Sequence, residues 1–279
     1  MDVDLHHAKS RPYMGMAARD DIDSLNKNFY LSKTAASWYA EKEFVLPEEQ
    51  AFLREYGEAI RGGRVLDIGI GAGRSTRYLI PLAGSYVGVD YSPDMVREAA
   101  EHFPGAQIEE RDARDLSAYA AGEFDFVMFS FNGMDCLSHE GRMQTLAEVR
   151  RVLKPGGIFA FSAHNRDRPK VVPYSIRYLN RSKHPVRMAK NVWQFIEGIR
   201  DWRRSLHCAV DEPEYALRHD SGNFFKVPMY YISKQAQVAQ LERLGFVPEV
   251  IYDGHGQLAK AEDVDPVSSW IFYVCRKPA

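Results

Sequence analysis

Ten residues, Val65 to Arg74, constrain the fold more than any other part of the chain. Their sequence, VLDIGIGAGR, reads as a buried strand that runs into a glycine-rich turn, with a helix expected from about Ser75 to Pro81. Glycines in such a turn let the backbone approach a ligand closely, and the start of a helix offers unpaired N–H groups. Asp67, just before the first glycine, favours a ligand that carries a cationic amine and hydroxyls over a pyrophosphate.

The dinucleotide-binding fingerprint does not fit this turn. That fingerprint is G-x-G-x-x-G, and Arg74 stands where its third glycine belongs. The turn reads instead as G-x-G-x-G, from Gly69 to Gly73, and the Lys-Ser/Thr pair of a phosphate-binding loop is absent. Because such turns also occur for structural reasons alone, the function of this one depends on its surroundings.

Strands and helices alternate along most of the chain. Apolar runs bounded by turn residues follow one another from Arg64 onward, with helical periodicity between them. The alternation predicts an α/β fold with a doubly wound, mostly parallel, seven-stranded sheet of the Rossmann-like kind. The expected strands are 64–68, 86–90, 107–111, 124–129, 158–162, 246–252 and 270–276.

The chain divides into five expected parts. Residues 1–20 should form a mobile N-terminus, and residues 21–60, which are rich in aromatic side chains, an N-terminal helical cap. The core should occupy 61–165, where the regular alternation stops. Residues 166–231 read as a lid inserted after the fifth strand, and 232–279 as a helix and two strands that complete the core.

Composition excludes several classes of protein. A net charge of −2 gives no general reason for binding nucleic acid, and no apolar run is long enough to span a bilayer. The three cysteines are widely spaced and fit neither a disulfide framework nor a metal site. We therefore expect a cytoplasmic protein with no metal and with neither nucleic acid nor a membrane as a partner. The oligomeric state does not follow from the sequence.

Acidic residues stand at the ends of three successive strands or directly after them. Asp90 follows the glycines by about 20 residues, where an acid can accept hydrogen bonds from both ribose hydroxyls of a nucleotide. Asp112 is placed to accept a bond from an adenine amine. Each acid alone could be a solvated loop residue. Since the carboxyl ends of parallel strands form the ligand crevice of such sheets, the set with Asp67 predicts a nucleoside ligand.

With these features in place, the chain resembles the class I S-adenosylmethionine-dependent methyltransferase superfamily. The resemblance implies S-adenosyl-L-methionine as the methyl donor and S-adenosyl-L-homocysteine as a product. Ile70 departs from the Cys or Thr that is common there, at a variable position. The matching segments are 65–74, 87–92, 111–113, 124–130 and 148–157.

The resemblance also implies roles for individual residues toward the donor. Asp67 would reach its amino group directly or through water, Asp90 its ribose hydroxyls, and Tyr91 and Asp112 its adenine. Relatives cover the methionine end with N-terminal aromatic residues, although such residues can equally pack a helix against the domain. The implied donor site is Asp67, Gly69, Gly71, Gly73, Asp90, Tyr91, Asp112, Ala113, Ser130, Phe131, Tyr30 and Tyr39.

The resemblance leaves the methyl acceptor open. Methyl transfer is an in-line displacement at the sulfonium carbon, and a hydroxyl acceptor also needs a base for its proton. His164, directly after the fifth strand, is the first candidate for this base, with Asp135 and His139 after the fourth strand as others. Each of these side chains could instead have a structural role, and the two tyrosines below could be core residues. Candidate acceptor contacts are Asn132, Asn165, Arg166, Tyr230 and Tyr231.

The expected lid is basic. Between Arg166 and Arg204 there are eleven Lys or Arg residues and three Asp or Glu, with an apolar stripe at helical spacing over 192–199. One reading is a solvated helix packed over the sheet edge. The other is a lid whose early arginines, Arg166, Arg177 and Arg181, attract an anionic acceptor.

The sequence thus predicts a methyltransferase that acts on an O or N atom of a small acceptor, with an anionic acceptor as one hypothesis. Two alternatives stay open. One is an RNA or protein methyltransferase, which the basic lid would suit. The other is a non-catalytic S-adenosylmethionine-binding protein, against which the intact acids and glycines argue.

Overall fold

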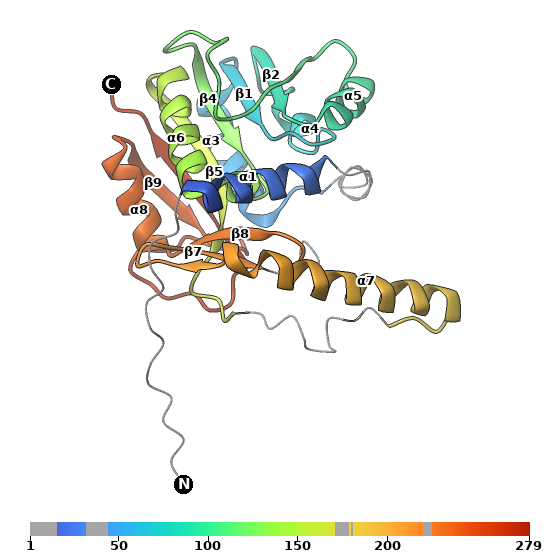
Figure 1. Cartoon of the computed structure of the whole chain (residues 1–279). Coiled ribbons are helices and arrows are strands. Elements are labelled where there is room, and N and C mark those ends of the chain that lie inside the picture. The colour runs from blue at the N-terminus through green and yellow to red at the C-terminus, as the bar shows by residue number, and fades with distance from the viewer. Residues whose placement is uncertain (1–15, 32–43, 171–178, 180, 220–224) are drawn as a thin grey trace.

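A mostly parallel sheet runs through the middle of the protein in a computed structural model that describes residues 16–31, 44–170, 179, 181–219 and 225–279 (Figure 1). Five strands are parallel, in the order β3-β2-β1-β4-β5, and β10 pairs antiparallel with both β5 and β9. These strands are β1 (Arg64–Ile68), β2 (Ser85–Asp90), β3 (Gln107–Glu110), β4 (Phe124–Phe129), β5 (Leu153–Asn165), β9 (Val247–Tyr252) and β10 (Trp270–Arg276). All seven expected strands are therefore present, and the α/β fold is confirmed.

The prediction of seven strands is nevertheless wrong, because the sheet has ten. The segment expected to form a lid supplies β6 (Val210–Asp211), β7 (Tyr215–His219) and β8 (Pro228–Ile232). β8 pairs in parallel with the last two residues of β5, past the point where β4 ends. Every residue of β8 is buried, so its short apolar run lacks the alternation that marks a half-exposed strand.

Helices cover both faces of the sheet. One face packs against α6 and α8 through Leu146, Val149 and Leu241, and the other against α3 and α4 through Phe52 and Leu79. The helices are α1 (Met16–Tyr30), α3 (Pro47–Ile60), α4 (Thr76–Leu79), α5 (Pro93–His102), α6 (His139–Val152), α7 (Pro185–Ser205) and α8 (Lys234–Arg243). Short 3-10 turns, η1 (Gly133–Cys136) and η3 (Leu206–Cys208), precede α6 and follow α7.

Side-chain caps and turn residues fix the helix starts. Ser138 accepts a hydrogen bond from the Gly141 N–H at the start of α6, and Ser233 accepts one from Ala236 at the start of α8. Ser92 stands at the start of α5 without such a side-chain bond. Its own N–H instead donates to the Asp90 carboxylate, so this turn is held by a residue of the candidate site.

The expected N-terminus at 1–20 and the expected helical cap at 21–60 lie partly outside the described residues. Tyr39 and Arg177 lie outside them altogether. In the part of the chain that the structure describes, no helix has the length and apolar character needed to cross a membrane. Within the same residues, no group of three or more His, Cys, Asp or Glu side chains is arranged to hold a metal ion.

Candidate active site

A cleft opens at the carboxyl ends of β1, β2 and β4. About 860 Å³ of empty space lies within it, part of which is open solvent, and residues of the glycine turn form one wall. Of the predicted donor residues, the cleft is lined by Tyr30, Gly69, Gly71, Asp90, Tyr91, Ala113, Ser130 and Phe131. Asp67, Gly73 and Asp112 are not among the lining residues.

Gly71 and Asp90 form the centre of the glycine-turn wall. The Gly71 N–H donates to Asp90 Oδ2 at 2.9 Å, and the Ser92 N–H donates to Oδ1 at 2.9 Å. Gly71 has a φ of +55°, which favours glycine, and a Cβ there would meet no atom within 4 Å. The backbone thus faces open space, and burial raises the pKa of Asp90 above its usual value.

Asp67 lies beneath the turn rather than in the cleft. The side chain is fully buried, and its Oδ2 accepts hydrogen bonds from Ser75 Oγ at 2.7 Å and Tyr86 OH at 2.9 Å. Burial raises the pKa of Asp67 to about 7, against the effect of these two bonds. Asp67 does not line the cleft, and its expected contact with the donor, direct or through water, stays a prediction. Ser75, which does line the cleft, is the residue through which Asp67 can act.

Asp112 does not line the cleft and is bound to an arginine instead. Its two oxygens accept from Arg114 Nε at 2.9 Å and Nη2 at 2.6 Å, and this ion pair lowers the pKa of Asp112, although burial alone would raise it. Arg114 also donates to Asp23 of α1 at 2.8 Å. Asp112 thus helps to hold α1 in place, and the prediction that its side chain reads the adenine edge is not supported.

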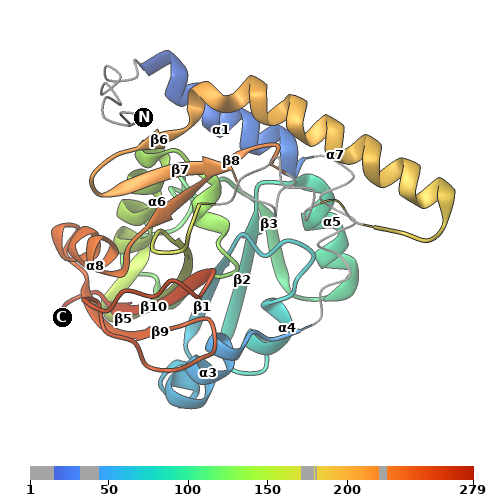
Figure 2. The ribbon, with the colours of Figure 1, turned by 90° about the horizontal axis from the view of Figure 1, so that it is seen from below.

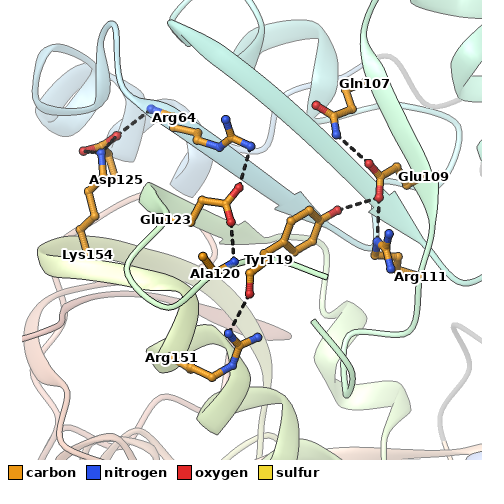
Figure 3. Close-up of polar contacts among 10 residues, drawn as sticks. All are labelled: Arg64, Gln107, Glu109, Arg111, Tyr119, Ala120, Glu123, Asp125, Arg151 and Lys154. Atoms are coloured by element: carbon orange, nitrogen blue, oxygen red, sulfur yellow. Dashed lines mark hydrogen bonds and ion pairs between the residues drawn. The ribbon is translucent and has the colours of Figure 1, made fainter. Parts of the chain in front are cut away.

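Arg111 lines the cleft, where the sequence predicted Asp112. The Arg111 Nε donates to Glu109 at 2.7 Å. Tyr119 OH donates to the same Glu109 carboxylate at 3.1 Å, while Arg151 donates to the Tyr119 carbonyl (Figure 3). Contacts from β3 to α6 therefore orient this guanidinium, and the sequence offered no signal for it beyond its position next to Asp112.

The chain makes an unusual turn where β4 ends. Phe131 and Asn132 have φ values of +54° and +58°, in the left-handed region that non-glycine residues rarely adopt. The Asn132 N–H donates to Ser162 Oγ at 2.8 Å, which fixes the turn to β5. Strained backbone of this kind is concentrated at functional sites, and here it directs Phe131 into the cleft. Asn132 itself is buried behind the lining.

Arg74, which sequence reasoning treated only as a missing glycine, also lines the cleft. Its guanidinium forms two 2.6 Å bonds to Glu49 of α3, donates to Ser130 Oγ at 3.1 Å and lies 4.9 Å from the Phe131 ring centroid. The ion pair is buried, with side-chain exposures of 8% and 1%. An acidic pair, Glu48 and Glu49, in the first turn of α3 was the signal that could have pointed to a buried cation.

Helix α1 covers one side of the cleft. Tyr30 lines the cleft, while Asp23 accepts from the Ser138 N–H at 2.7 Å and from Ser138 Oγ at 3.0 Å. Asn26 donates to the carbonyl of Pro228 at 3.1 Å. The helix is therefore attached both to the start of α6 and to the strand β8.

His164 and Asp135 are brought together from β5 and η1. Asp135 Oδ2 accepts from the His164 N–H at 2.6 Å and contacts His164 Nδ1 at 2.8 Å, while Oδ1 accepts from Arg142 at 2.6 Å. Asp135 and Arg142 are fully buried, and 12% of the His164 side chain is exposed. Asp135 lies between Gly133 and Cys136, two residues of the cleft lining. These contacts hold the His164 ring in one orientation, although neither His164 nor Asp135 is itself among the residues that line the cleft.

The other candidate base lies in a different environment. His139 Nδ1 contacts Tyr230 OH at 2.9 Å, and its ring stacks on Tyr215 at 4.3 Å. Tyr230 is fully buried, and its ring lies 4.5 Å from the Arg142 guanidinium, as expected of a core residue. Tyr231, by contrast, places its ring 5.0 Å from that of His164.

Asn165 and Arg166 are engaged elsewhere. The Asn165 amide is fully buried and donates to the carbonyls of Asp265 and Ser268, so it anchors the loop before β10. Arg166 donates to Asp211 at 2.7 Å and to the carbonyl of Pro213 at 2.9 Å. Neither side chain lines the cleft, and their expected contact with the acceptor is not supported.

Known methyltransferases share the sequence of this region. Residues 65–157 match a family described as a methyltransferase domain. The chain is 26% identical over 181 residues to a ubiquinone biosynthesis O-methyltransferase of Bordetella avium, covering 59% of this chain and 73% of the relative. It is 31% identical over 165 residues to a demethylmenaquinone methyltransferase of Tropheryma whipplei, covering 56% and 64%. The chain thus spans about two thirds of the length of these relatives.

Solved structures share the fold at lower identity. The 1,6-didemethyltoxoflavin-N1-methyltransferase of Burkholderia thailandensis, solved with 1,6-didemethyltoxoflavin and S-adenosylhomocysteine, superposes with a TM-score of 0.59 at 13% identity, over 97% of this chain and 94% of that one. A protein of Pyrococcus horikoshii gives a TM-score of 0.54 at 21% identity, over 89% and 93%. These solved structures show the shared fold alone; the methyltransferase domain matched over residues 65–157 and the curated relatives place the chain in the class I S-adenosylmethionine-dependent methyltransferase superfamily.

Proposed function

We propose that this protein transfers the methyl group of S-adenosylmethionine to an oxygen or nitrogen atom of a small acceptor, and that a hydroxyl oxygen suits the site best. The observation that carries this proposal is the His164–Asp135 pair beside the cleft, with its 2.8 Å contact at Nδ1. A neutral amine needs no base to accept a methyl group, whereas a hydroxyl must lose a proton. An oriented histidine is therefore most useful to a hydroxyl acceptor.

The residues of the glycine-turn wall suit the donor. Each Asp90 oxygen accepts one backbone N–H, and a carboxylate oxygen can accept a second bond, which leaves capacity for the two ribose hydroxyls. Gly71 faces open space, so a ligand can approach its backbone. Tyr91 and Ala113 line the end of the cleft that would hold the adenine, and Ser130 and Phe131 the end that would hold the sulfonium.

The chain's own residues would control the position of the acceptor and its proton. When bound, the donor supplies a methyl carbon on a sulfonium; the acceptor oxygen attacks it in line, the C–S bond breaks and S-adenosylhomocysteine remains. The Nδ1–H bond to Asp135 leaves Nε2 as the basic nitrogen of His164, and this atom would take the hydroxyl proton. Arg142, on the other Asp135 oxygen, keeps the carboxylate from rotating away.

The comparisons support a small acceptor. The Bordetella relative is named as an O-methyltransferase of ubiquinone biosynthesis, which agrees with a hydroxyl acceptor, while the Burkholderia structure is that of an N1-methyltransferase. An anionic acceptor gains no support from Arg166, because Asp211 already binds its guanidinium. Arg181 is exposed on the segment before α7.

The test separates donor binding from proton transfer. Calorimetric titration with S-adenosylmethionine measures donor affinity, and transfer of its radiolabelled methyl group to a panel of phenols and aromatic amines measures turnover. For a phenol acceptor, His164→Gln should lower kcat by about 10²–10⁴-fold and leave the donor Kd within about twofold. The exposed His255 provides the control variant His255→Gln. Absent donor binding would refute the function as a whole, and unchanged kcat in His164→Gln would refute only the base.

A further inference from the structure

The outward face of α7 carries apolar side chains that no part of the described chain covers. Val186, Trp193 and Ile196 are 71%, 60% and 49% exposed. At 1.5 Å per residue the helix is about 32 Å long, and its N-terminal end extends beyond the rest of the described chain in both views (Figures 1 and 2). A water-facing helix would normally place polar residues at these three positions.

Basic residues surround these apolar side chains. Lys190 lies about one turn before Trp193 and Arg200 about two turns after it, on the same face of the helix. Both are exposed, and neither has an acidic partner among the described residues. Along the whole helix, five basic residues stand against two acidic ones, Glu197 and Asp201.

The opposite face of α7 is covered to a greater extent. Phe195 and Ile199 are half-buried, and Gly198 and Ser205 are buried, with Ser205 Oγ 2.7 Å from His219 Nε2. Because this inner face makes the contacts with the protein, the outer face is not needed for folding. The basic character expected of a lid over the site is thus directed away from the protein.

We propose that the outer face of α7, defined by Val186, Lys190, Trp193, Ile196 and Arg200, binds the surface of a membrane that contains anionic lipid. Tryptophan and aliphatic side chains among lysines and arginines are typical of helices that lie in the headgroup region of a bilayer. A nucleic acid would attract the same charges but would give no role to the exposed valine and isoleucine. This inference is independent of the methyl transfer proposed above, and it differs from the sequence-based expectation of no membrane partner.

Sedimentation with lipid vesicles tests the proposal. The full chain should bind vesicles of phosphatidylcholine with roughly one third phosphatidylglycerol and not phosphatidylcholine alone, and added salt should weaken the binding. The double variant Lys190→Gln/Arg200→Gln should lower the partition constant about 25-fold, from about fivefold for each lost charge. Trp193→Ala should also weaken binding, and the tryptophan emission of the wild type should shift to the blue on binding by more than that of Trp193→Ala, which keeps the chain's other three tryptophans.

Matched variants on other surfaces provide the controls. Arg54 of α3 and Lys260 are exposed basic residues, so Arg54→Gln/Lys260→Gln removes the same charge. Leu258, 73% exposed, provides the apolar control Leu258→Ala. Both control proteins should bind as the wild type does. Circular dichroism should show the same melting temperature for every variant, because all the changed side chains are exposed.

Several results would overturn the proposal. One is a wild-type chain that does not sediment with the anionic vesicles, and another is an equal loss of binding in the α7 and control variants. Two further results assign the face to a different partner. These are a dimer that Trp193→Ala dissociates in the absence of vesicle binding, and tighter binding to single-stranded RNA than to the vesicles.

Discussion

The two halves of the candidate site are built from different parts of the polypeptide. The donor half consists largely of main chain, with Gly69 and Gly71 at positive φ and backbone N–H groups aimed at Asp90. The acceptor half consists of side chains from separate elements, with His164 on β5 and Asp135 on η1. A main-chain site is encoded by a short run of residues, whereas a side-chain network depends on how distant segments pack. This difference predicts different responses to substitution.

Arg142→Met should have the largest effect and should act on the acceptor half. The Arg142 guanidinium is fully buried, and it donates to Asp135 at 2.6 Å and to Gln237 at 2.7 Å. Its removal leaves a buried carboxylate without its cation, which costs about 3–5 kcal/mol in the free energy of unfolding. Urea denaturation measures this loss. Arg150→Met, at an exposed position of the same helix, should cost much less, and equal losses would refute the argument.

Gly71→Ala should have the next largest effect and should act on the donor half. Gly71 and Gly105 both have positive φ, at +55° and +94°, and a Cβ at either would meet no atom within 4 Å. Both alanine variants carry backbone strain, more at Gly105, whose φ lies further from the left-handed minimum, but only Gly71 lines the cleft. A Cβ at position 71 would project into the space where we expect the donor, so donor affinity should fall for Gly71→Ala alone, and a displacement of the donor by about 1 Å can lower the rate by about 100-fold. Calorimetric titration with S-adenosylmethionine measures the donor Kd of both variants, and similar values would contradict the assignment of Gly71 to the donor site.

Local sequence patterns predicted the first strand and the glycine turn well for a physical reason. The run from Val65 to Gly73 contains both the buried strand and the turn, so the pattern and the structure coincide there. The prediction was less accurate where a side chain had a choice of partners. Asp67 and Asp112 follow the expected pattern, yet one is buried under the turn and the other binds Arg114. Chain position alone does not specify which of several nearby groups a carboxylate will contact.

The acceptor half was predictable only as a set of candidates. His164 and Asp135 were both named from their positions after strands, but their contact depends on η1 and β5 being neighbours. The hairpin of β7 and β8 was missed, because a short buried strand without alternation resembles any other apolar run. The buried ion pair of Arg74 and Glu49 was also missed. Like the contact between Asp135 and His164, it joins residues that are far apart in the sequence.

Asp67→Asn should have the smallest effect in free energy of the three substitutions. It tests the difference between the two halves of the site, because Asp67 is a buried side chain in the donor half, which consists mostly of main chain. Burial raises the pKa of Asp67 from 3.8 to about 7, so the native state binds this proton more tightly than the unfolded state does. The stabilisation from the protonated group is complete below the unfolded pKa and is lost as the pH rises through the folded pKa.

Between about pH 5 and pH 7 the wild type should lose roughly 2 kcal/mol of unfolding free energy relative to the asparagine variant, which cannot titrate. Glu48, whose pKa burial also raises to about 7, titrates in both proteins and cancels in the difference. Urea denaturation across this pH range measures the effect, and parallel pH profiles for the two proteins would show that the carboxylate stays ionised beneath the turn.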